Sequence, residues 1–88
     1  MADKSFQLEI ITPNKKLFSG QIASLIAPAS DGYLGVLANH APLITTLSPG
    51  KITARDSQGG ATVFSSSGSG LLEVNHNQVI LLADEIQS

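Results

Sequence analysis

Two histidines and two adjacent acids are the side chains of this 88-residue sequence that are best suited to chemistry. His40 and His76 are the only imidazoles, and no patterned cluster of further ligands accompanies them, so the sequence predicts no metal site. Asp84 and Glu85 are neighbours, and on a strand their side chains would point to opposite faces instead of acting as a paired acid and base. We therefore expect His76 to be an exposed turn residue and both acids to be solvated.

The run of serines and glycines from 65 to 70 is the only low-complexity segment. A Gly68-Ser69-Gly70 loop could cradle a phosphate only with a following lysine or a helix N-terminus, and the sequence provides neither. Cysteine is absent, which excludes disulfides, thiolate metal sites and cysteine nucleophiles. We therefore expect a flexible turn at 65–70, and a chain that is not an enzyme and binds no cofactor.

Composition limits the chain to one small domain, residues 1–88. Hydrophobic residues make up 42% and aromatic residues 5%, with no tryptophan, so the core must be mostly aliphatic. The net charge of −2 offers no basic surface, and we expect no nucleic-acid binding. The polar start, 1–5, is followed by alternation, so we expect neither a signal peptide nor a transmembrane helix, and any link to a membrane must come through partners.

A period of two dominates the chain and predicts short strands. Phe6, Leu8 and Ile10 share one face of a half-buried strand, whereas residues 22–27 are apolar on both faces apart from Ser24 and indicate a strand covered on both sides. Further strands are predicted at 51–55, 61–66, 72–74 and 79–83, and residues 80–86 could instead form a helix in isolation. We expect a strand there that ends near Asp84. Strands with turn signals about every eight to twelve residues indicate an all-β sandwich or barrel.

The stretch from Asp31 to Leu43 is the most informative part of the sequence, because it combines two glycines with a His-Ala-Pro corner. Glycine permits a positive φ or a close backbone approach, and Pro42 fixes its own φ and favours extended geometry at the residue before it. We expect a short strand that ends in a stiff corner. On the residues alone, this corner could simply cap a strand, with the His40 ring bonded to backbone groups.

This stretch, read as Gly-x-Leu-Gly-Val-Leu-x-x-His-Ala-Pro-Leu, resembles the signature of the epsilon subunit of F-type ATP synthases. Other segments of the chain fall in the same order as in that family, at compatible spacing, and the resemblance covers nearly the whole chain. These segments are 6–12 with Pro13, 17–20, 26–28, 47–51, 70–74 and 81–84.

The resemblance implies a two-sheet β-sandwich of about eight to ten short strands that serves as a non-catalytic rotor subunit of the central stalk. Such a subunit joins the gamma subunit to the membrane c-ring and couples ion translocation, by default of protons and alternatively of sodium, to ATP synthesis. The residues carried over to the gamma contact are His40, Ala41, Pro42 and Leu43. Those carried over to the c-ring contact are Ala29, Ser30, Asp31, Gly32 and Tyr33, with Asp31 meeting a basic group.

The implied location is peripheral, on the cytoplasmic face of a bacterial plasma membrane or on the stromal face of a thylakoid, with the membrane touched only through the c-ring. The family often has Glu where Tyr33 stands, so the ring contact here would rely on Asp31 together with the Tyr33 ring. The Gly-Gly pair of the family is Ser69-Gly70 in this sequence.

The sequence ends at Ser88, where most relatives continue into an alanine-rich helical hairpin. Both a naturally short epsilon subunit and a trimmed one fit this end. We expect no C-terminal helical domain in this sequence, and hence neither inhibition of ATP hydrolysis nor nucleotide binding by it. The alternative function is an unrelated β-sandwich module that binds a ligand or peptide. A sugar-binding surface is disfavoured, because Tyr33 is the one aromatic residue near the stretch 31–43. A small hydrolase lacks a triad or dyad.

Overall fold

The fold is an all-β sandwich, seen in a computed structural model that describes residues 4–87. Its strands are β1 (Phe6–Ile11), β2 (Lys16–Ile22), β3 (Ser24–Ala29), β4 (Gly32–Leu37), β5 (Leu43–Leu47), β6 (Gly50–Arg55), β7 (Ala61–Ser66), β8 (Gly70–Asn75), β9 (Gln78–Ala83) and β10 (Ile86–Gln87). Among residues 4–87 we find no helix of the length and hydrophobicity needed to cross a membrane.

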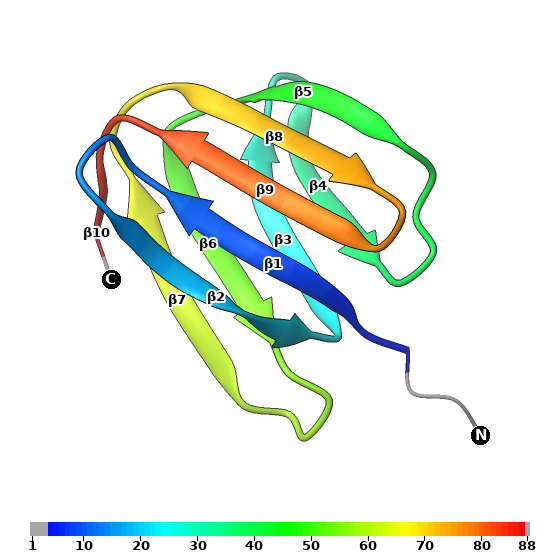
Figure 1. The fold of residues 1–88 in the computed structure, drawn as a ribbon. Helices are drawn as coiled ribbons and strands as arrows, with labels where there is room; N and C mark the ends of the chain where they lie inside the picture. Colours follow the sequence, from blue (N-terminus) through cyan, green and yellow to red (C-terminus); the bar gives the residue numbers. More distant parts are fainter. Residues whose placement is uncertain (1–3, 88) are drawn as a thin grey trace.

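The strands form two layers, as Figure 1 shows. One layer has the order β4-β3-β6-β7-β10 and the other the order β5-β8-β9-β1-β2, with β1 and β9 as a parallel pair. Strand β3 joins the layers, because its first half pairs with β6 and its last residue, Ala29, pairs with Leu47 of β5. The prediction of a two-sheet sandwich with eight to ten strands is confirmed, and the ten strands form one continuous sheet that curls on itself.

Pro28 lies inside β3, a strand with neighbours on both sides. Proline has no N–H to donate, so it fits a central strand only where the ladder is interrupted. Pro28 occupies the gap between the part of β3 that pairs with β6 and the residue that pairs with β5, and its carbonyl accepts a hydrogen bond from the Ser48 N–H at 2.8 Å. The proline thus marks the point at which β3 passes from one layer to the other.

The core lies between the two layers and is mostly aliphatic, as the composition predicts. The inward residues of β1 alternate with half-buried ones, as the period-two pattern requires. Phe6 and Phe64 are the buried aromatic residues, and the ring of Phe64 meets the half-buried ring of Phe18 edge to face at a centroid distance of 5.9 Å. The buried apolar residues are Phe6, Leu8, Ile10, Ile22, Leu25, Ala27, Val36, Leu47, Ile52, Ala54, Phe64, Leu72, Val74, Val79, Leu81, Ala83 and Ile86.

Three details of the sequence prediction are wrong. The turn expected at 65–70 is shorter, because β7 runs to Ser66 and β8 begins at Gly70. Residues 22–27 are not one strand, because Ile22 ends β2 and β3 begins at Ser24 in the other layer. The strand predicted at 79–83 does end next to Asp84, at Ala83, but it is not the last strand, because Ile86 and Gln87 form β10 against Ser66 and Ser65 of β7. Ser88 lies outside the described residues.

The prediction that His76 lies in a turn is confirmed: β8 ends at Asn75, β9 begins at Gln78, and His76 and Asn77 between them have φ angles of 51° and 62°. Positive φ at both central residues is the geometry of a tight hairpin turn that matches strand twist. His76 is exposed in this turn, as expected. Ser69, which replaces a glycine of the family pattern, is not among the positive-φ residues, so a side chain is tolerated at that position.

Candidate functional site

The residues predicted to meet the c-ring form the tip of the β3–β4 hairpin. Ala29 pairs with Gly32, so Ser30 and Asp31 are the two residues of the turn, and both are exposed. Gly32 has φ of 120°, which a residue with a side chain rarely adopts. In the part of the chain that the structure describes, no cation forms an ion pair with Asp31. The carboxylate is therefore presented to solvent at the end of a short, defined turn.

Tyr33 is bound back onto its own layer, although its side chain is 61% exposed. Its hydroxyl oxygen accepts a hydrogen bond from the Lys51 N–H at 3.1 Å. A side chain at Gly50 would place its Cβ 2.7 Å from that oxygen and 3.0 Å from Cγ of Pro28, so the glycine makes room for the tyrosine. The family resemblance implied that the Tyr33 ring contributes to the c-ring contact together with Asp31. The Lys51 N–H uses one lone pair of the Tyr33 hydroxyl oxygen, and a large part of the side chain remains exposed to solvent.

The residues predicted to meet gamma form the corner between β4 and β5. The His40 N–H donates to the Leu37 carbonyl at 3.2 Å, and His40 Nδ1 lies 2.7 Å from the Ala41 carbonyl oxygen. The ring is thus bonded to backbone, which was the simpler interpretation of this corner. Ala41 and Pro42 are exposed, whereas Leu43 is half-buried and packs against the core.

A pair of asparagines, which the sequence analysis missed, holds this corner in place. The Asn39 N–H donates to Oδ1 of Asn77 at 2.6 Å, and Nδ2 of Asn77 donates to Oδ1 of Asn39 at 3.1 Å. The Asn77 carbonyl accepts from the Gln7 N–H at 3.0 Å. Both asparagines have positive φ, and the Asn-His-Asn turn was the available signal for one of them. These bonds tie the corner to the β8–β9 turn and to β1.

Two hollows lie beside these residues. One of about 330 Å³ is lined by Asn39, His40, Pro42, His76 and Asn77. The other, of about 190 Å³, is lined by residues 29–34 together with Leu43 and Thr45. The second hollow brings Leu43, from the predicted gamma group, against the whole predicted c-ring group, and Ser30 Oγ lies 3.5 Å from Thr45 Oγ1 across it. The two groups therefore adjoin at Leu43, while His40 and Pro42 line the first hollow.

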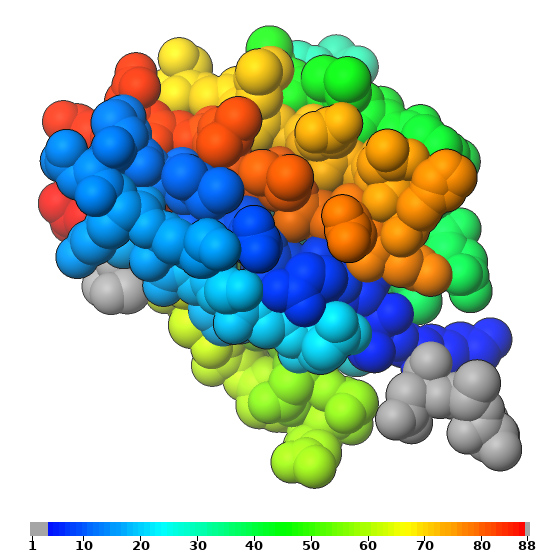
Figure 2. Space-filling view, in the orientation of Figure 1, coloured from blue at the N-terminus to red at the C-terminus, as the bar shows by residue number. Residues whose placement is uncertain are grey.

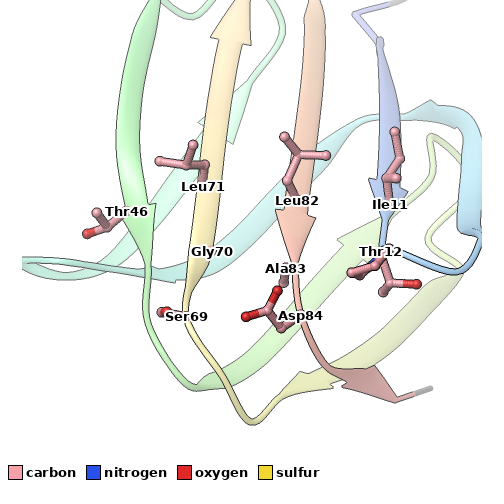
Figure 3. A pocket seen from close by; sticks show the side chains of 10 residues that line it. Ile11, Thr12, Thr46, Ser69, Gly70, Leu71, Leu82, Ala83 and Asp84 are labelled. Atoms are coloured by element: carbon pink, nitrogen blue, oxygen red, sulfur yellow. The ribbon is translucent and has the colours of Figure 1, made fainter.

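The outer face of the β5-β8-β9-β1-β2 layer carries apolar side chains that the sequence analysis did not single out, and Figure 2 views this face. Ile44 on β5 is 68% exposed. Leu71, Leu82 and Ile11 are register partners on β8, β9 and β1 and line a groove of about 520 Å³, drawn in Figure 3. In sequence, a strand that is apolar on both faces cannot be told from one covered on both sides.

The other layer also carries exposed apolar side chains on its outer face, at Ile26, Tyr33, Leu37 and Val63. The register places Ile26 beside Gly35 and Thr53, and Thr53 beside Val63, so these side chains share one face. Large exposed apolar patches on small proteins mark interaction surfaces. Among residues 4–87, no three His, Cys, Asp or Glu side chains gather closely enough to hold a metal ion.

Comparisons with known proteins agree on one family. The family described as "ATP synthase, Delta/Epsilon chain, beta-sandwich domain" matches residues 5–88. Proteins named ATP synthase epsilon chain are similar to this chain at 48% identity over 80 residues in Dichelobacter nodosus and at 44% over 85 residues in Chlorobaculum tepidum. A chain in the solved structure of the Euglena gracilis mitochondrial ATP synthase has the same fold, with a TM-score of 0.88 at 20% identity.

The relatives differ in length. The alignments cover 91% of this chain and 55% of the Dichelobacter nodosus protein, but 97% of this chain and 96% of the Chlorobaculum tepidum protein. The match to the Euglena gracilis chain covers 98% of this chain and 54% of that one. This chain therefore spans about half the length of some relatives and nearly the whole length of others.

Proposed function

This chain belongs to the ATP synthase delta/epsilon β-sandwich family, and from that premise we propose that it is a non-catalytic subunit of the central stalk that joins the gamma subunit to the c-ring. In this role it rotates with both partners and transmits torque through contacts alone. Its location is then peripheral, on the cytoplasmic face of a bacterial plasma membrane or on the stromal face of a thylakoid.

The observation that supports the proposal most is the placement of the two motif segments. The hairpin tip at Ser30 and Asp31 and the corner from His40 to Leu43 are both exposed wholly or in part, and one strand, β4, connects them. Hydrogen bonds hold both segments to the sandwich. The first is held by the bond between Tyr33 and Lys51, and the second by the bonds between Asn39 and Asn77. A densely packed sandwich resists shear, so two such surfaces keep a fixed geometry under torque.

The proposed gamma contact is centred on the corner. Ala41 and Pro42 are exposed and uncharged, as the centre of an interface requires, and Leu43 supports them from the core side. Ala41→Glu would place a charge in this contact, and we expect the Kd for gamma to rise at least about tenfold because the carboxylate is desolvated. Thr62→Glu on β7 introduces the same charge at an exposed position outside the corner and serves as the control. Equal affinities of the two folded variants would place the gamma contact elsewhere.

The proposed c-ring contact is centred on Asp31. An exposed ion pair contributes roughly 0–1 kcal/mol, and reversal of its charge adds repulsion, so Asp31→Lys should weaken ring association by about 1–2 kcal/mol at low salt. The loss should shrink as salt is raised, because exposed charges are screened. Asp84→Lys makes the same charge change at another exposed aspartate. If the two variants bind the ring alike at low salt, the assignment of the hairpin tip to the ring is wrong.

A further inference from the structure

Strand β4 is an open edge of its layer, because β3 is its only hydrogen-bonded neighbour among the described residues (Figure 1). In an antiparallel pair, successive residues alternate between bonding to the partner strand and pointing their N–H and C=O groups away from it. Ala29 and Gly32 close the two-residue turn and are a hydrogen-bonded pair, so the pair of Pro28 and Tyr33 is not. The Pro28 carbonyl confirms this phase, because it bonds to Ser48 on the opposite side of β3.

Continuing the alternation along β4 identifies the groups on the free edge. The N–H and C=O groups of Tyr33, Gly35 and Leu37 point away from β3. The Leu37 carbonyl has a partner there, the His40 N–H. No hydrogen bond from another residue in the range 4–87 reaches the backbone groups of Tyr33 and Gly35. These two residues therefore offer two donors and two acceptors in the plane of the sheet.

This edge lacks the features that protect exposed strands against pairing. Edge strands are commonly blocked by a charged side chain, a proline or a bulge. The six residues of β4 are uncharged and contain no proline, and their register with β3 shows no shift. The nearest charge in sequence is Asp31 in the turn before the strand.

The surroundings of the edge favour an extended segment with apolar side chains. On the outer face, Tyr33 and Leu37 lie on either side of Gly35, which leaves open space between them, and Ile26 is the register partner of Gly35 on β3. Leu37 is 64% exposed. On the inner side, the hollow of about 190 Å³ opens beside Leu34 and Leu43, which are both half-buried. Side chains of a strand added here would alternate between these two apolar environments.

We propose that β4 binds an extended segment of a partner chain, which pairs its backbone with Tyr33 and Gly35 and adds a strand to the β4-β3-β6-β7-β10 layer. The proposal rests on the proposed function for the identity of the partner, the gamma subunit, because β4 links the two segments assigned to contacts in the central stalk. The bound segment is uncharged at the paired positions and has an N–H where it meets the Gly35 carbonyl.

Gly35 allows a matched test. Gly35→Pro removes the outward N–H without removing a bond to β3, and proline is tolerated on a strand edge in this orientation. Gly35→Ala keeps the N–H and puts a methyl group into open space on the outer face. The probe is purified gamma subunit, titrated into both variants and the wild-type chain. We expect Gly35→Pro to raise the Kd at least about fivefold over Gly35→Ala, because a backbone bond is lost and the proline ring obstructs the approach.

Hydrogen exchange of the wild-type chain gives a second measurement that needs no variant. We expect gamma to slow exchange at the Tyr33 and Gly35 amides at least about tenfold, while Leu34, whose N–H already bonds to β3, changes less. If gamma binds the wild-type chain but the two variants bind alike and these amides exchange as in the free chain, strand addition at β4 is refuted while the proposed function stands. If gamma does not bind the wild-type chain, the proposed function fails and this inference fails with it.

Discussion

Gly70 is the glycine at which an added methyl group should destabilise the sandwich most. It lies in β8 between two neighbours, Leu47 on β5 and Ala83 on β9. A Cβ at this position would overlap the carbonyl oxygen of Leu82 and lie 2.9 Å from Cα of Ala83. Both obstacles are backbone atoms of the adjacent strand, so they cannot be avoided by a change of rotamer. Gly70→Ala must separate β8 from β9.

The cost follows from the overlap. Forcing extra atoms into a packed interior costs about 1–3 kcal/mol or more, and we expect about 3 kcal/mol here because the main chain itself must shift. A domain of this size has a free energy of unfolding of about 4–13 kcal/mol, so the loss is a large fraction of it. It corresponds to a fall in Tm of roughly 10–25 °C.

Gly35→Ala is the matched control, because nothing lies within 4 Å of the Cβ that it adds. It should stabilise the domain by about 0.4–1 kcal/mol, since alanine restricts the unfolded chain. Urea denaturation followed by far-UV circular dichroism measures both changes and suits a chain without tryptophan. Equal unfolding midpoints for the two variants would refute the close approach of β9 to Gly70.

Three further predictions concern the hydrogen bonds that hold Tyr33 and the corner in place, and the binding of ATP. Tyr33→Phe should cost about 0.5–1 kcal/mol of unfolding free energy and speed amide exchange at Lys51, and unchanged exchange there would exclude the hydrogen bond to the tyrosine hydroxyl. Asn77→Ala should cost about 1–2 kcal/mol, and Asn77→Gly less, because glycine keeps the φ of 62° and loses only the bonds to Asn39. Calorimetry of this 88-residue chain with ATP should show no saturable heat, because residues 4–87 form no helix whose N-terminus could hold phosphates, and a saturable heat would reveal an unrecognised site in the sandwich.

Strands with one buried face could be predicted from the sequence. The alternation of Phe6, Leu8 and Ile10 predicts a strand, as do the local patterns at 51–55 and 61–66, and the structure confirms all three strands. The break at Ala23 was not predictable in this way. It depends on β2 pairing with β1 while β3 starts in the other layer, and a local pattern of apolar residues does not encode the layer. Strand β10 has two residues, too few for a period, and exists only through its pairing with β7.

The candidate site was predictable only where a motif carried it. The segments 29–33 and 40–43 came from the family resemblance, and the structure places both at turns or corners on the surface. The hydrogen bond between Asn39 and Asn77 joins residues that are 38 positions apart, and no local sequence pattern identifies either residue as the partner of the other. The free edge of β4 was also not predictable from the sequence, because it depends on which strands lie beside β4 and on the phase of its hydrogen bonds with β3.

The central claim is that one sandwich holds gamma and the c-ring at the same time. Native mass spectrometry of this chain mixed with purified gamma and detergent-solubilised c-ring tests it directly, because it counts the copies in each assembly. We expect an assembly with one copy of this chain per gamma on a ring, and a smaller yield of gamma-bearing rings when the chain is omitted. Rings that carry gamma but never this chain, or a chain that binds neither partner, would contradict the account.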